Sequence, residues 1–320
     1  MFFFYHLLFF GCLVLIYLFS EWTVDNLLRL AKFLKWKKFV VAFLMMALAA
    51  SLPNLFVGIN SALAKIPELS FSEIVGGNII DLTLAVALAL LFTQAGIEAK
   101  GRTLQKSAIF TVIVALFPLI LIFDGILSRA DGIILIGLFV FYLFWIFSKE
   151  ERFYKVYNDY QLPEKEKFKN FLSDLGKLIL GIFLLLIAAK GIVISAQFFA
   201  QSFNLPLSLI GIFVVGVGNI LPETYFAIAS ARKGETEMIL GNLMGSVIFP
   251  STLVLGIVAL ICPIKISDFS PFVIARFFLI ISAFFFLIFI RTDKHLSKKE
   301  AWFLIGLYLL FVIAELLLRG

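Results

Sequence analysis

The chain has 320 residues, of which 62% are hydrophobic and only 15% are charged, and its formal net charge is +6. A soluble domain of this length cannot bury so much apolar surface in one core, so lipid must cover the remainder. The basic residues do not gather on a folded polar face, which argues against a nucleic-acid partner. The two cysteines, Cys12 and Cys262, have neither the number nor the spacing of a disulfide framework or a metal site.

Ten apolar segments are long enough to cross a bilayer as helices. Their predicted ranges are 3–30, 39–64, 72–93, 107–124, 131–148, 174–202, 207–231, 236–262, 270–290 and 299–318. The first segment lacks the basic start and the small-residue cleavage site of a signal peptide, so we expect it to be retained as a span. The expected fold class is therefore an all-α membrane protein with ten transmembrane helices.

Basic residues concentrate in alternate connections between these spans. The odd-numbered connections hold 21 Lys and Arg, whereas the even-numbered ones and both tails hold only Lys65, Arg129, Lys265 and Arg319. By the positive-inside rule, the odd connections are cytoplasmic and both termini lie outside the cell membrane. The fifth connection is the one substantial polar stretch, and it predicts a cytoplasmic linker over 149–173 between a first unit, 1–148, and a second unit, 174–320.

The two units carry an internal repeat. Sliding the chain along itself aligns 31–84 with 200–253 without a gap and pairs Pro53 with Pro222 and Gly76 with Gly245. The matched prolines and glycines are the strongest evidence for the repeat, because these residues impose particular backbone conformations. Each unit has five predicted spans, and an odd number places the second copy upside down in the membrane. Two inverted five-helix repeats with a ligand site at the midplane are typical of secondary transporters.

Two carboxylates, Asp81 and Glu223, lie deepest in apolar sequence, each near an internal proline or a glycine pair. A charge at the centre of a span costs roughly 2.5–3.5 kcal/mol on insertion scales, so each is a candidate functional residue. The alternative is a protonated, hydrogen-bonded structural carboxyl. Hard oxygen ligands suit calcium, sodium or protons. The sequence contains no pairing of a nucleophile with a base, no phosphate loop and no cofactor fingerprint, so we expect no enzyme and no cofactor.

At these residues the chain resembles the cation/calcium antiporter superfamily, which includes the sodium/calcium exchangers. Each family repeat reads approximately G-T-S-L/A-P-E and then, further along the chain, G-S-N-I-F-N/D. Here Ser51-Leu52-Pro53-Asn54 leads to Gly76-Gly77-Asn78-Ile79-Ile80-Asp81, and Leu221-Pro222-Glu223 leads to Gly245-Ser246. The two parts are equally far apart in both copies, since the step from 54 to 77 equals the step from 223 to 246. The resemblance covers nearly the whole chain in length, number of spans and loop pattern.

The resemblance implies a central group of ion sites and alternating access by sliding of the first and sixth helices. It makes Glu223 the ligand glutamate of the second repeat and places Ser51 and Ser246 at ion-coordinating hydroxyl positions. The motifs also depart from the family pattern, since Asn54 replaces a glutamate and Pro250 removes a polar ligand. The residues and the resemblance together predict seven ion ligands: Glu223, Asp81, Asn54, Ser51, Asn78, Ser246 and Asn219.

The expected function is a secondary antiporter that exchanges calcium against sodium or protons at a midplane site. Two carboxylates suffice to neutralise one calcium ion or to bind one or two protons. The alternative is a degenerate family member that does not transport and acts as a sensor or binding subunit, because several polar ligands of the motif are replaced. A membrane-embedded hydrolase would need a second polar cluster or a histidine within one, whereas His6 and His295 lie near segment ends and form no cluster.

Overall fold

The computed structural model describes residues 2–33, 49–94, 96–99, 101–147, 168–234, 236–266, 272–292 and 294–317. Most of the predicted linker, 149–167, lies outside these residues, and the helix that follows begins at Phe168, inside the range predicted as linker. The predicted second span, 39–64, is described only from Ala49 onward.

The first half consists of eight helical segments and two short strands among the described residues. In chain order they are α1 (Phe2–Phe33), α3 (Ala49–Leu63), α4 (Glu68–Ile80), the π-helix η2 (Asp81–Ala85), α5 (Val86–Phe92), β1 (Ile97–Glu98), α6 (Arg102–Leu121), the 3-10 helix η3 (Ile122–Asp124), β2 (Ile126–Leu127) and α7 (Arg129–Phe147).

The second half follows the same pattern. It comprises α9 (Phe168–Phe203), α10 (Leu207–Leu209), the π-helix η5 (Ile210–Val215), α11 (Gly216–Lys233), α12 (Thr236–Phe249), the π-helix η6 (Pro250–Val254), α13 (Leu255–Ile261), β3 (Ile264–Lys265), α14 (Val273–Arg291), β4 (His295–Leu296) and α15 (Lys298–Leu317).

Within the described ranges, eight helices are long and apolar enough to cross a membrane. A bent pair, Leu207–Leu221 and Glu223–Arg232, makes a ninth candidate. These nine coincide with nine of the ten predicted spans. The bend in the pair is 47° and falls at Pro222. Proline cannot donate the helical backbone hydrogen bond, which explains the bend.

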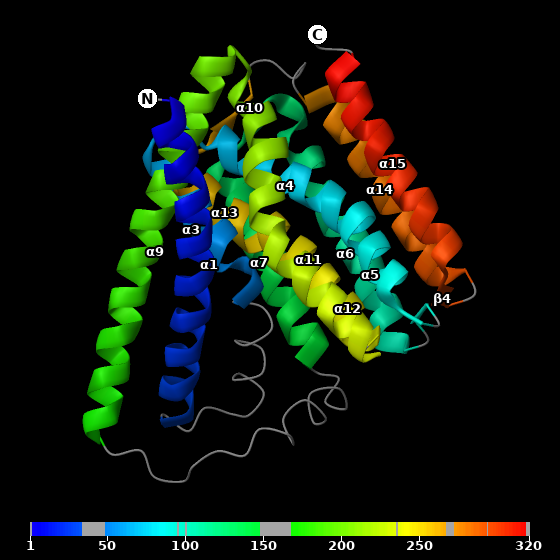
Figure 1. The fold of residues 1–320 in the computed structure, drawn as a ribbon, viewed down its shortest axis with the longest axis horizontal. Helices are drawn as coiled ribbons and strands as arrows, with labels where there is room; N and C mark the ends of the chain where they lie inside the picture. Colours follow the sequence, from blue (N-terminus) through cyan, green and yellow to red (C-terminus); the bar gives the residue numbers. More distant parts are fainter. Residues whose placement is uncertain are drawn as a thin grey trace.

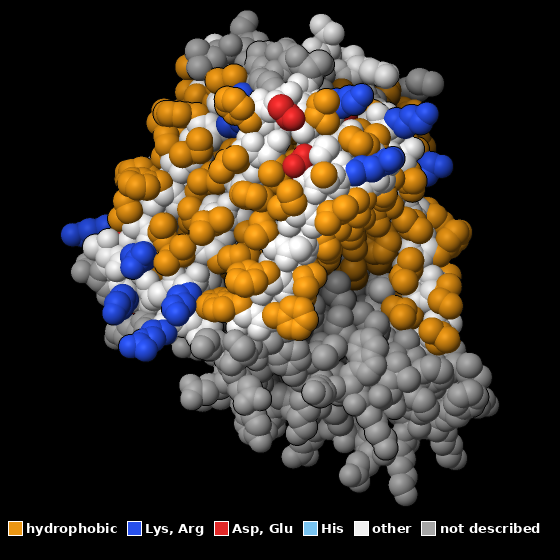
Figure 2. Space-filling view, turned by 180° about the vertical axis from the view of Figure 1, so that it is seen from behind, with side chains coloured by type: hydrophobic (Ala, Val, Ile, Leu, Met, Phe, Trp, Pro, Cys, Tyr) orange, Lys and Arg blue, Asp and Glu red, His pale blue; other side chains and the backbone are white. Residues whose placement is uncertain are grey.

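The outer surface is largely apolar. Phe3, Phe144 and Leu317 expose 80%, 74% and 75% of their surfaces. Figure 2 shows hydrophobic side chains covering the visible face, with Lys and Arg toward its margins. A water-soluble monomer does not leave so much contiguous apolar surface exposed. The protein is therefore a multi-pass membrane protein whose exposed apolar side chains face lipid.

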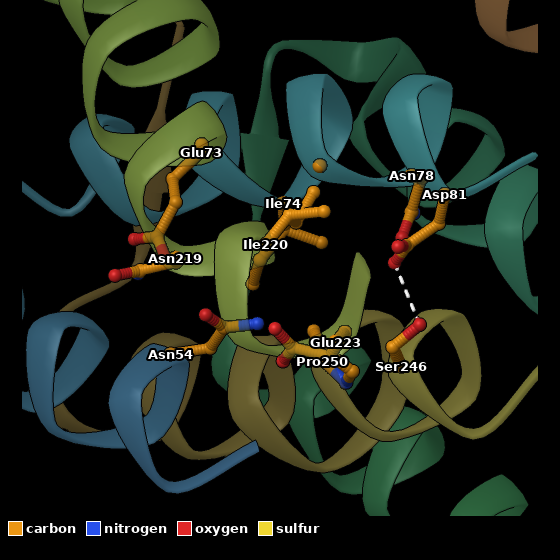
Figure 3. Close-up of a pocket in the computed structure, with 12 residues that line it drawn as sticks. Asn54, Glu73, Ile74, Asn78, Asp81, Asn219, Ile220, Glu223, Ser246 and Pro250 are labelled. Carbon is orange, nitrogen blue, oxygen red and sulfur yellow. Dashed lines mark hydrogen bonds between the residues drawn. The ribbon is translucent and has the colours of Figure 1, made fainter. Parts of the chain in front are cut away.

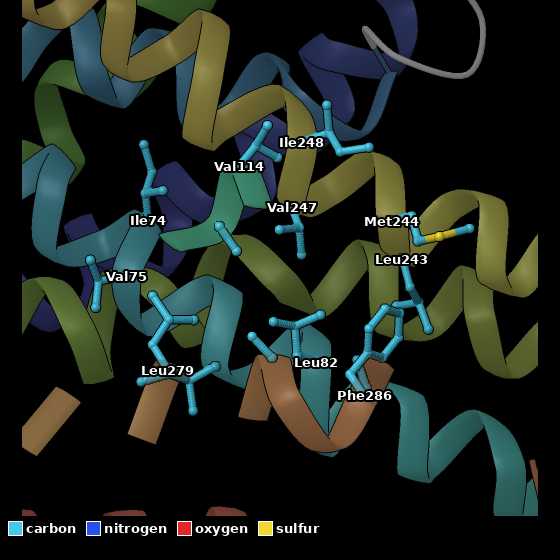
Figure 4. Packing of buried hydrophobic residues seen from close by; sticks show 14 of the residues in the cluster. Ile74, Val75, Leu82, Val114, Leu243, Met244, Val247, Ile248, Leu279 and Phe286 are labelled. Carbon is cyan, nitrogen blue, oxygen red and sulfur yellow. The ribbon is translucent and has the colours of Figure 1, made fainter. Parts of the chain in front are cut away.

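Two long helices, α1 and α9, pack side by side along one flank and run in opposite directions (Figure 1). A buried apolar cluster that includes Ile16, Val57 and Ile192 joins them to α3. The other helices pack around a larger cluster, in which Leu82, Val247 and Phe286 lie close together (Figure 4). The polar residues discussed below lie between these two apolar clusters.

The shift that aligns the two halves of the sequence also aligns their secondary structure. It carries the bounds of the π-helix η2, Asp81 and Ala85, onto those of the π-helix η6, Pro250 and Val254. In each, a threonine hydroxyl donates to a carbonyl one turn earlier, Thr83 to Ile79 and Thr252 to Ile248, at 2.5 Å. A π-helical turn interrupts the regular ladder of backbone hydrogen bonds, and the threonine hydroxyl gives the carbonyl an additional partner.

The tertiary contacts repeat in the same way. Helix α5 packs on α15 as α13 packs on α7, and α4 packs on α14 as α12 packs on α6. The strands pair across the halves: β1 with β4, and β2 with β3. The first pair joins the third and ninth connections of the chain, and the second pair joins the fourth and eighth. The beginning of α1 and the end of α15 lie at the same end of the molecule (Figure 1).

Candidate ion-binding site

A buried cavity lies where the middle parts of α3, α4, α11 and α12 meet. Its volume is about 10 Å³, which is the space of about one water molecule or one ion. The residues that line it are Asn54, Glu73, Ile74, Gly77, Asn78, Asp81, Gly216, Asn219, Ile220, Glu223, Ser246 and Pro250. Each end of the cavity is polar, and Ile74 and Ile220 lie between the two ends (Figure 3).

Helix α4 supplies polar groups to both ends. Glu73, Gly77 and Asp81 follow one another at intervals of four positions, which places them on one face of a helix. The helix is buried from Leu69 to Ile80, so this face cannot point to lipid or water. Asp81 is the first residue of the π-helix η2, and such turns occur frequently at functional sites.

Glycine allows α4 to approach the second half closely. A Cβ atom at Gly76 would lie 2.5 Å from the backbone oxygen of Ile212 in η5, closer than real Cβ atoms come. A Cβ atom at Gly77 would lie 3.1 Å from Cδ1 of Ile220. The helices therefore approach one another closely at this glycine pair. The repeat partner of Gly76 differs, because nothing lies within 4 Å of a Cβ placed at Gly245.

Three hydrogen bonds connect the side chains at the cavity. The Nδ2–H of Asn219 donates to Oε1 of Glu73. The hydroxyl of Ser246 donates to Oδ2 of Asp81 at 2.7 Å, as drawn in Figure 3. The Nδ2–H of Asn78 donates to the hydroxyl of Ser251, in η6, at 2.8 Å. Each of the first two bonds joins a carboxylate of the first half to a neutral donor of the second half.

Five buried side-chain oxygens around the cavity have no hydrogen-bond partner among the described residues: Asn54 Oδ1, Glu73 Oε2, Asp81 Oδ1, Asn219 Oδ1 and Glu223 Oε2. Leaving a buried acceptor unpaired is costly, so such atoms require a donor or a cation. All five atoms are hard oxygen acceptors, and three belong to carboxylates. The donor set therefore fits a hard cation such as calcium or sodium, or a proton, and does not fit a soft metal.

Glu223 lies within electrostatic range of both other carboxylates, Asp81 and Glu73. In the part of the chain that the structure describes, no three His, Cys, Asp or Glu side chains are grouped closely enough to hold one metal ion. The three carboxylates thus share a cavity without forming a single cluster.

The structure brings together six of the seven predicted ligands: Asn54, Asn78, Asp81, Asn219, Glu223 and Ser246 all line this cavity. Ser51 is buried on α3 but is not among the lining residues.

Sequence reasoning missed Glu73, because a span predicted to start at residue 72 places it at the membrane boundary. The helix in fact begins at Glu68. The regular spacing of Glu73, Gly77 and Asp81, one helical turn apart, was a signal that could have found it.

The fold and the cavity together define a class of protein, a multi-pass membrane transporter with a buried polar site between its helices. Residues 4–148 and 174–317 match the sequence profile of the family described as "Sodium/calcium exchanger protein". Since the match spans most of the chain, the protein belongs to the sodium/calcium exchanger protein family, which is a family of transporters and not of enzymes, as predicted.

Individual relatives agree with this assignment. The sodium/calcium exchanger MaX1 of Methanosarcina acetivorans is 25% identical, over 92% of this chain and 93% of its own. The inner membrane protein YrbG of Escherichia coli K12 is 29% identical over 72% of each chain. Among solved structures, the sodium-calcium exchanger NCX_Mj soaked with Na⁺ and Sr²⁺ superposes with a TM-score of 0.63 at 24% identity and covers 100% of both chains. This last likeness shows that the two chains share a fold.

Proposed function

We propose that this protein is a secondary antiporter that exchanges calcium against sodium or protons through the cavity described above. The observation that supports this proposal best is the group of five unpartnered buried oxygens, three of them carboxylate oxygens, in a cavity between the halves. The names of the relatives agree with it, since MaX1 and NCX_Mj are described as sodium/calcium exchangers.

In this proposal Asp81 and Glu223 neutralise one calcium ion. Asn78 and Ser246, which lie beside Asp81 (Figure 3), complete the shell on that side. Asn54 and Asn219 supply amide oxygens, and Ser51 lies one turn before Asn54 on α3. Calcium accepts six to eight such oxygens in flexible arrangements, and waters complete the set. Neither a nucleophile nor a resident cofactor enters the mechanism.

The architecture we propose is ten transmembrane helices arranged as two inverted five-helix repeats. It is supported by the recurrence of a π-helix and of helix contacts at the same shift that aligns the two halves of the sequence. The pairing of β1 with β4 and of β2 with β3 agrees with a two-fold axis in the membrane plane. The basic third and ninth connections would face the cytoplasm, and both termini would be extracytoplasmic.

Transport would proceed by alternating access, in which α1 and α9 slide along the other helices and open the cavity to one side at a time. These two helices contact α3, and α1 also contacts α11; α3 and α11 contribute Asn54 and Glu223. Coupling follows from charge. Uncompensated buried carboxylates are costly, so the protein with an empty site resists switching and an ion must accompany each half-cycle.

Flux in proteoliposomes tests this function. Wild-type protein should take up ⁴⁵Ca²⁺ when an outward gradient of sodium or of protons is imposed. Glu223→Gln should reduce this uptake to the level of empty vesicles, because it removes one of the two charges that balance calcium. Glu315→Gln is the matched control, since Glu315 is also a buried glutamate but does not line the cavity. Full uptake by Glu223→Gln would remove that residue from the mechanism.

One observation favours a second candidate function. Ile220 and Pro250 line the cavity at positions where the family motifs carry polar ligands, so ion coordination on the second-repeat side is reduced. A non-transporting sensor or binding subunit would keep the fold without exchange. Calorimetric titration with calcium, sodium and protons, combined with the flux assay, separates the two functions: ion binding without gradient-driven flux supports the sensor.

A further inference from the structure

Basic side chains gather at the rim of the molecule where β1 pairs with β4. Four of them are exposed and come from neighbouring segments: Arg102 and Lys106 of α6, Arg291 of α14 and Lys294, which directly precedes β4. In Figure 2 a group of Lys and Arg side chains lies at the lower left, the corner to which the turn from Figure 1 brings β4, and no acidic side chain is visible among them. Within the described residues, none of the four forms an ion pair with a carboxylate. Their charges are therefore available to an anion.

A single side-chain amide fixes these segments relative to one another. The Nε2 group of Gln105 donates to the carbonyl of Ile290 at 2.8 Å and to that of Ala99 at 2.6 Å. The N–H of Ala99 donates in turn to the Lys294 carbonyl at 2.8 Å. Each of the four basic residues belongs to this bonded set or lies within three positions of a member of it. The basic side chains thus extend from one hydrogen-bonded framework.

The two helices of this framework carry apolar stripes that lead to basic residues at the rim. On α6, Lys106 is followed at intervals of seven positions by Ile113 and Ile120, which are 51% and 65% exposed. On α14, Arg291 is preceded at the same interval by Phe284, which is 59% exposed. Seven residues are close to two helical turns, so the members of each stripe share a face. Since α6 and α14 pack against each other, two stripes that face lipid end in positive charges at the same rim.

The opposite rim, where β2 pairs with β3, repeats the fold without these charges. The shift that aligns the two halves carries Lys106 onto Ala275 and Arg291 onto Ile122. An acidic residue, Asp124, also lies at that second rim and is exposed. The repeated fold therefore does not require the basic side chains, which belong to one rim alone.

We infer that Arg102, Lys106, Arg291 and Lys294 bind the phosphate headgroup of an anionic phospholipid whose acyl chains lie along the apolar stripes of α6 and α14. Guanidinium and ammonium groups bind phosphate through charge-assisted hydrogen bonds, and basic clusters at the ends of membrane helices attract anionic lipids. Free phosphate would use only the basic part of this surface, whereas a phospholipid uses the stripes as well.

The inference needs only that the helices span a membrane and does not depend on calcium exchange. Under the proposed topology, the β1–β4 rim lies at the cytoplasmic leaflet. The lipid would bridge α6 and α14, the two helices that the Gln105 amide already joins.

Native mass spectrometry of the purified protein in detergent tests the site. Dioleoyl phosphatidylglycerol is the anionic probe, and dioleoyl phosphatidylcholine, with the same chains and no net charge, is the reference. Wild type should bind the first phosphatidylglycerol molecule at least about fivefold more tightly than phosphatidylcholine. Lys106→Gln combined with Arg291→Gln should weaken phosphatidylglycerol binding at least about tenfold, because each basic residue near an anionic lipid contributes roughly fivefold. Arg129→Gln combined with Lys265→Gln removes the same charge from the opposite rim and should change binding less than about threefold.

Gln105→Met separates a built site from diffuse electrostatic attraction. The substitution keeps the net charge and the side-chain length and removes both amide hydrogen bonds. It should weaken phosphatidylglycerol binding at least about threefold, since the basic residues are no longer held together. Arg291→Lys keeps the charge and should retain most of the binding. Equal helix content by circular dichroism in all variants shows that the losses do not come from unfolding.

The outcomes decide the inference. Equal affinity of wild type for the two lipids would overturn it, and so would equal losses in the two double variants. Unchanged binding in Gln105→Met would leave only diffuse attraction and would also overturn the built site. Release of bound phosphatidylglycerol by millimolar inorganic phosphate would show that the ligand is a free anion and not a lipid. None of these measurements contains calcium, so their failure and the failure of the proposed exchange are separate results.

Discussion

Individual oxygens define the chemistry of the cavity. Asp81 shows this best, because one of its oxygens accepts the Ser246 hydroxyl at 2.7 Å and the other has no partner. The bond joins α12 of the second half to the π-helix that follows α4. A neutral donor fixes the direction of the carboxylate without cancelling its charge, which leaves the free oxygen available to a cation.

Removal of the Ser246 hydroxyl tests whether this hydrogen bond positions the Asp81 carboxylate. Ser246→Ala should weaken calcium binding at least about tenfold, because a hydrogen bond to a charged group contributes roughly 1.5–3 kcal/mol. Binding of ⁴⁵Ca²⁺ to purified protein measures the effect. Ser282→Ala is the control, since Ser282 is fully buried on α14 and does not line the cavity. Equal calcium affinity in the two variants would contradict a positioning role for Ser246.

Residue by residue, the site was only partly predictable. The apolar surroundings of Asp81 and Glu223 were sufficient to single them out, because a charge in such a sequence has a cost that needs a reason. Glu73 escaped because the predicted start of its span was one helical turn too late. Ser51 was placed in the site by the motif, but the lining is set by the rotation of α3, which a motif does not specify.

Helix α4 and the π-helix η5 approach one another very closely at Gly76. A methyl group at Gly76 would lie 2.5 Å from Ile212 O and 2.7 Å from its Cα, and backbone atoms cannot give way as a side chain can. The two helices must therefore separate or shift along their lengths. Glu73 lies on α4, and Asn219 lies on α11, which directly follows η5, so the hydrogen bond between them would be disturbed as well.

Gly76→Ala should consequently destabilise the protein by about 1–3 kcal/mol, the usual cost of overpacking. Its repeat partner provides the control. A methyl group at Gly245 meets nothing within 4 Å, and Gly245→Ala should be neutral or stabilising by up to about 1 kcal/mol through helix propensity. Thermal unfolding in detergent checks both. A melting temperature of Gly76→Ala equal to that of wild type would contradict this close packing.

The positions of the spans followed from the sequence because hydropathy and length determine them. The π-helical turns that interrupt these spans did not follow from the sequence. Asp81–Ala85 reads DLTLA and contains neither proline nor glycine, yet it forms a π-helix in the same place as Pro250–Val254. Pro250 could have predicted a break in the second copy. Only the alignment of the repeats could have extended that prediction to the first copy. Tertiary packing, rather than the local sequence, accommodates the extra residue of a π-helical turn there.

The proposed topology predicts which side of the membrane each strand pair faces. Glu98 in β1 and Lys265 in β3 are both exposed. Glu98 belongs to the strand pair that joins the third and ninth connections. Lys265 belongs to the pair that joins the fourth and eighth connections. In a background in which Cys12 and Cys262 are replaced by alanine, an impermeant thiol reagent added to intact cells should label Lys265→Cys and not Glu98→Cys. Labelling of both from outside would refute the proposed topology.

The large-scale organisation was the part most open to prediction, because the internal repeat and the distribution of Lys and Arg are properties of the whole sequence. The contacts between the two halves could not be predicted from the sequence. Nothing in Ile97-Glu98 or His295-Leu296 indicates that these dipeptides pair. They are two-residue strands, far shorter than any segment in which alternation can be recognised.

Those short strands have a mechanical consequence. Each strand pair ties one half of the chain to the other, and further bonds extend it, from Ala99 N–H to the Lys294 carbonyl at 2.8 Å and from Ile266 N–H to the Gly125 carbonyl at 2.9 Å. One pair joins the α5–α6 connection to the α14–α15 connection, and the other joins the α6–α7 connection to the α13–α14 connection. Under the proposed mechanism α1 and α9, which border neither strand pair, would move as a unit while the helices joined by the strands keep their relative positions.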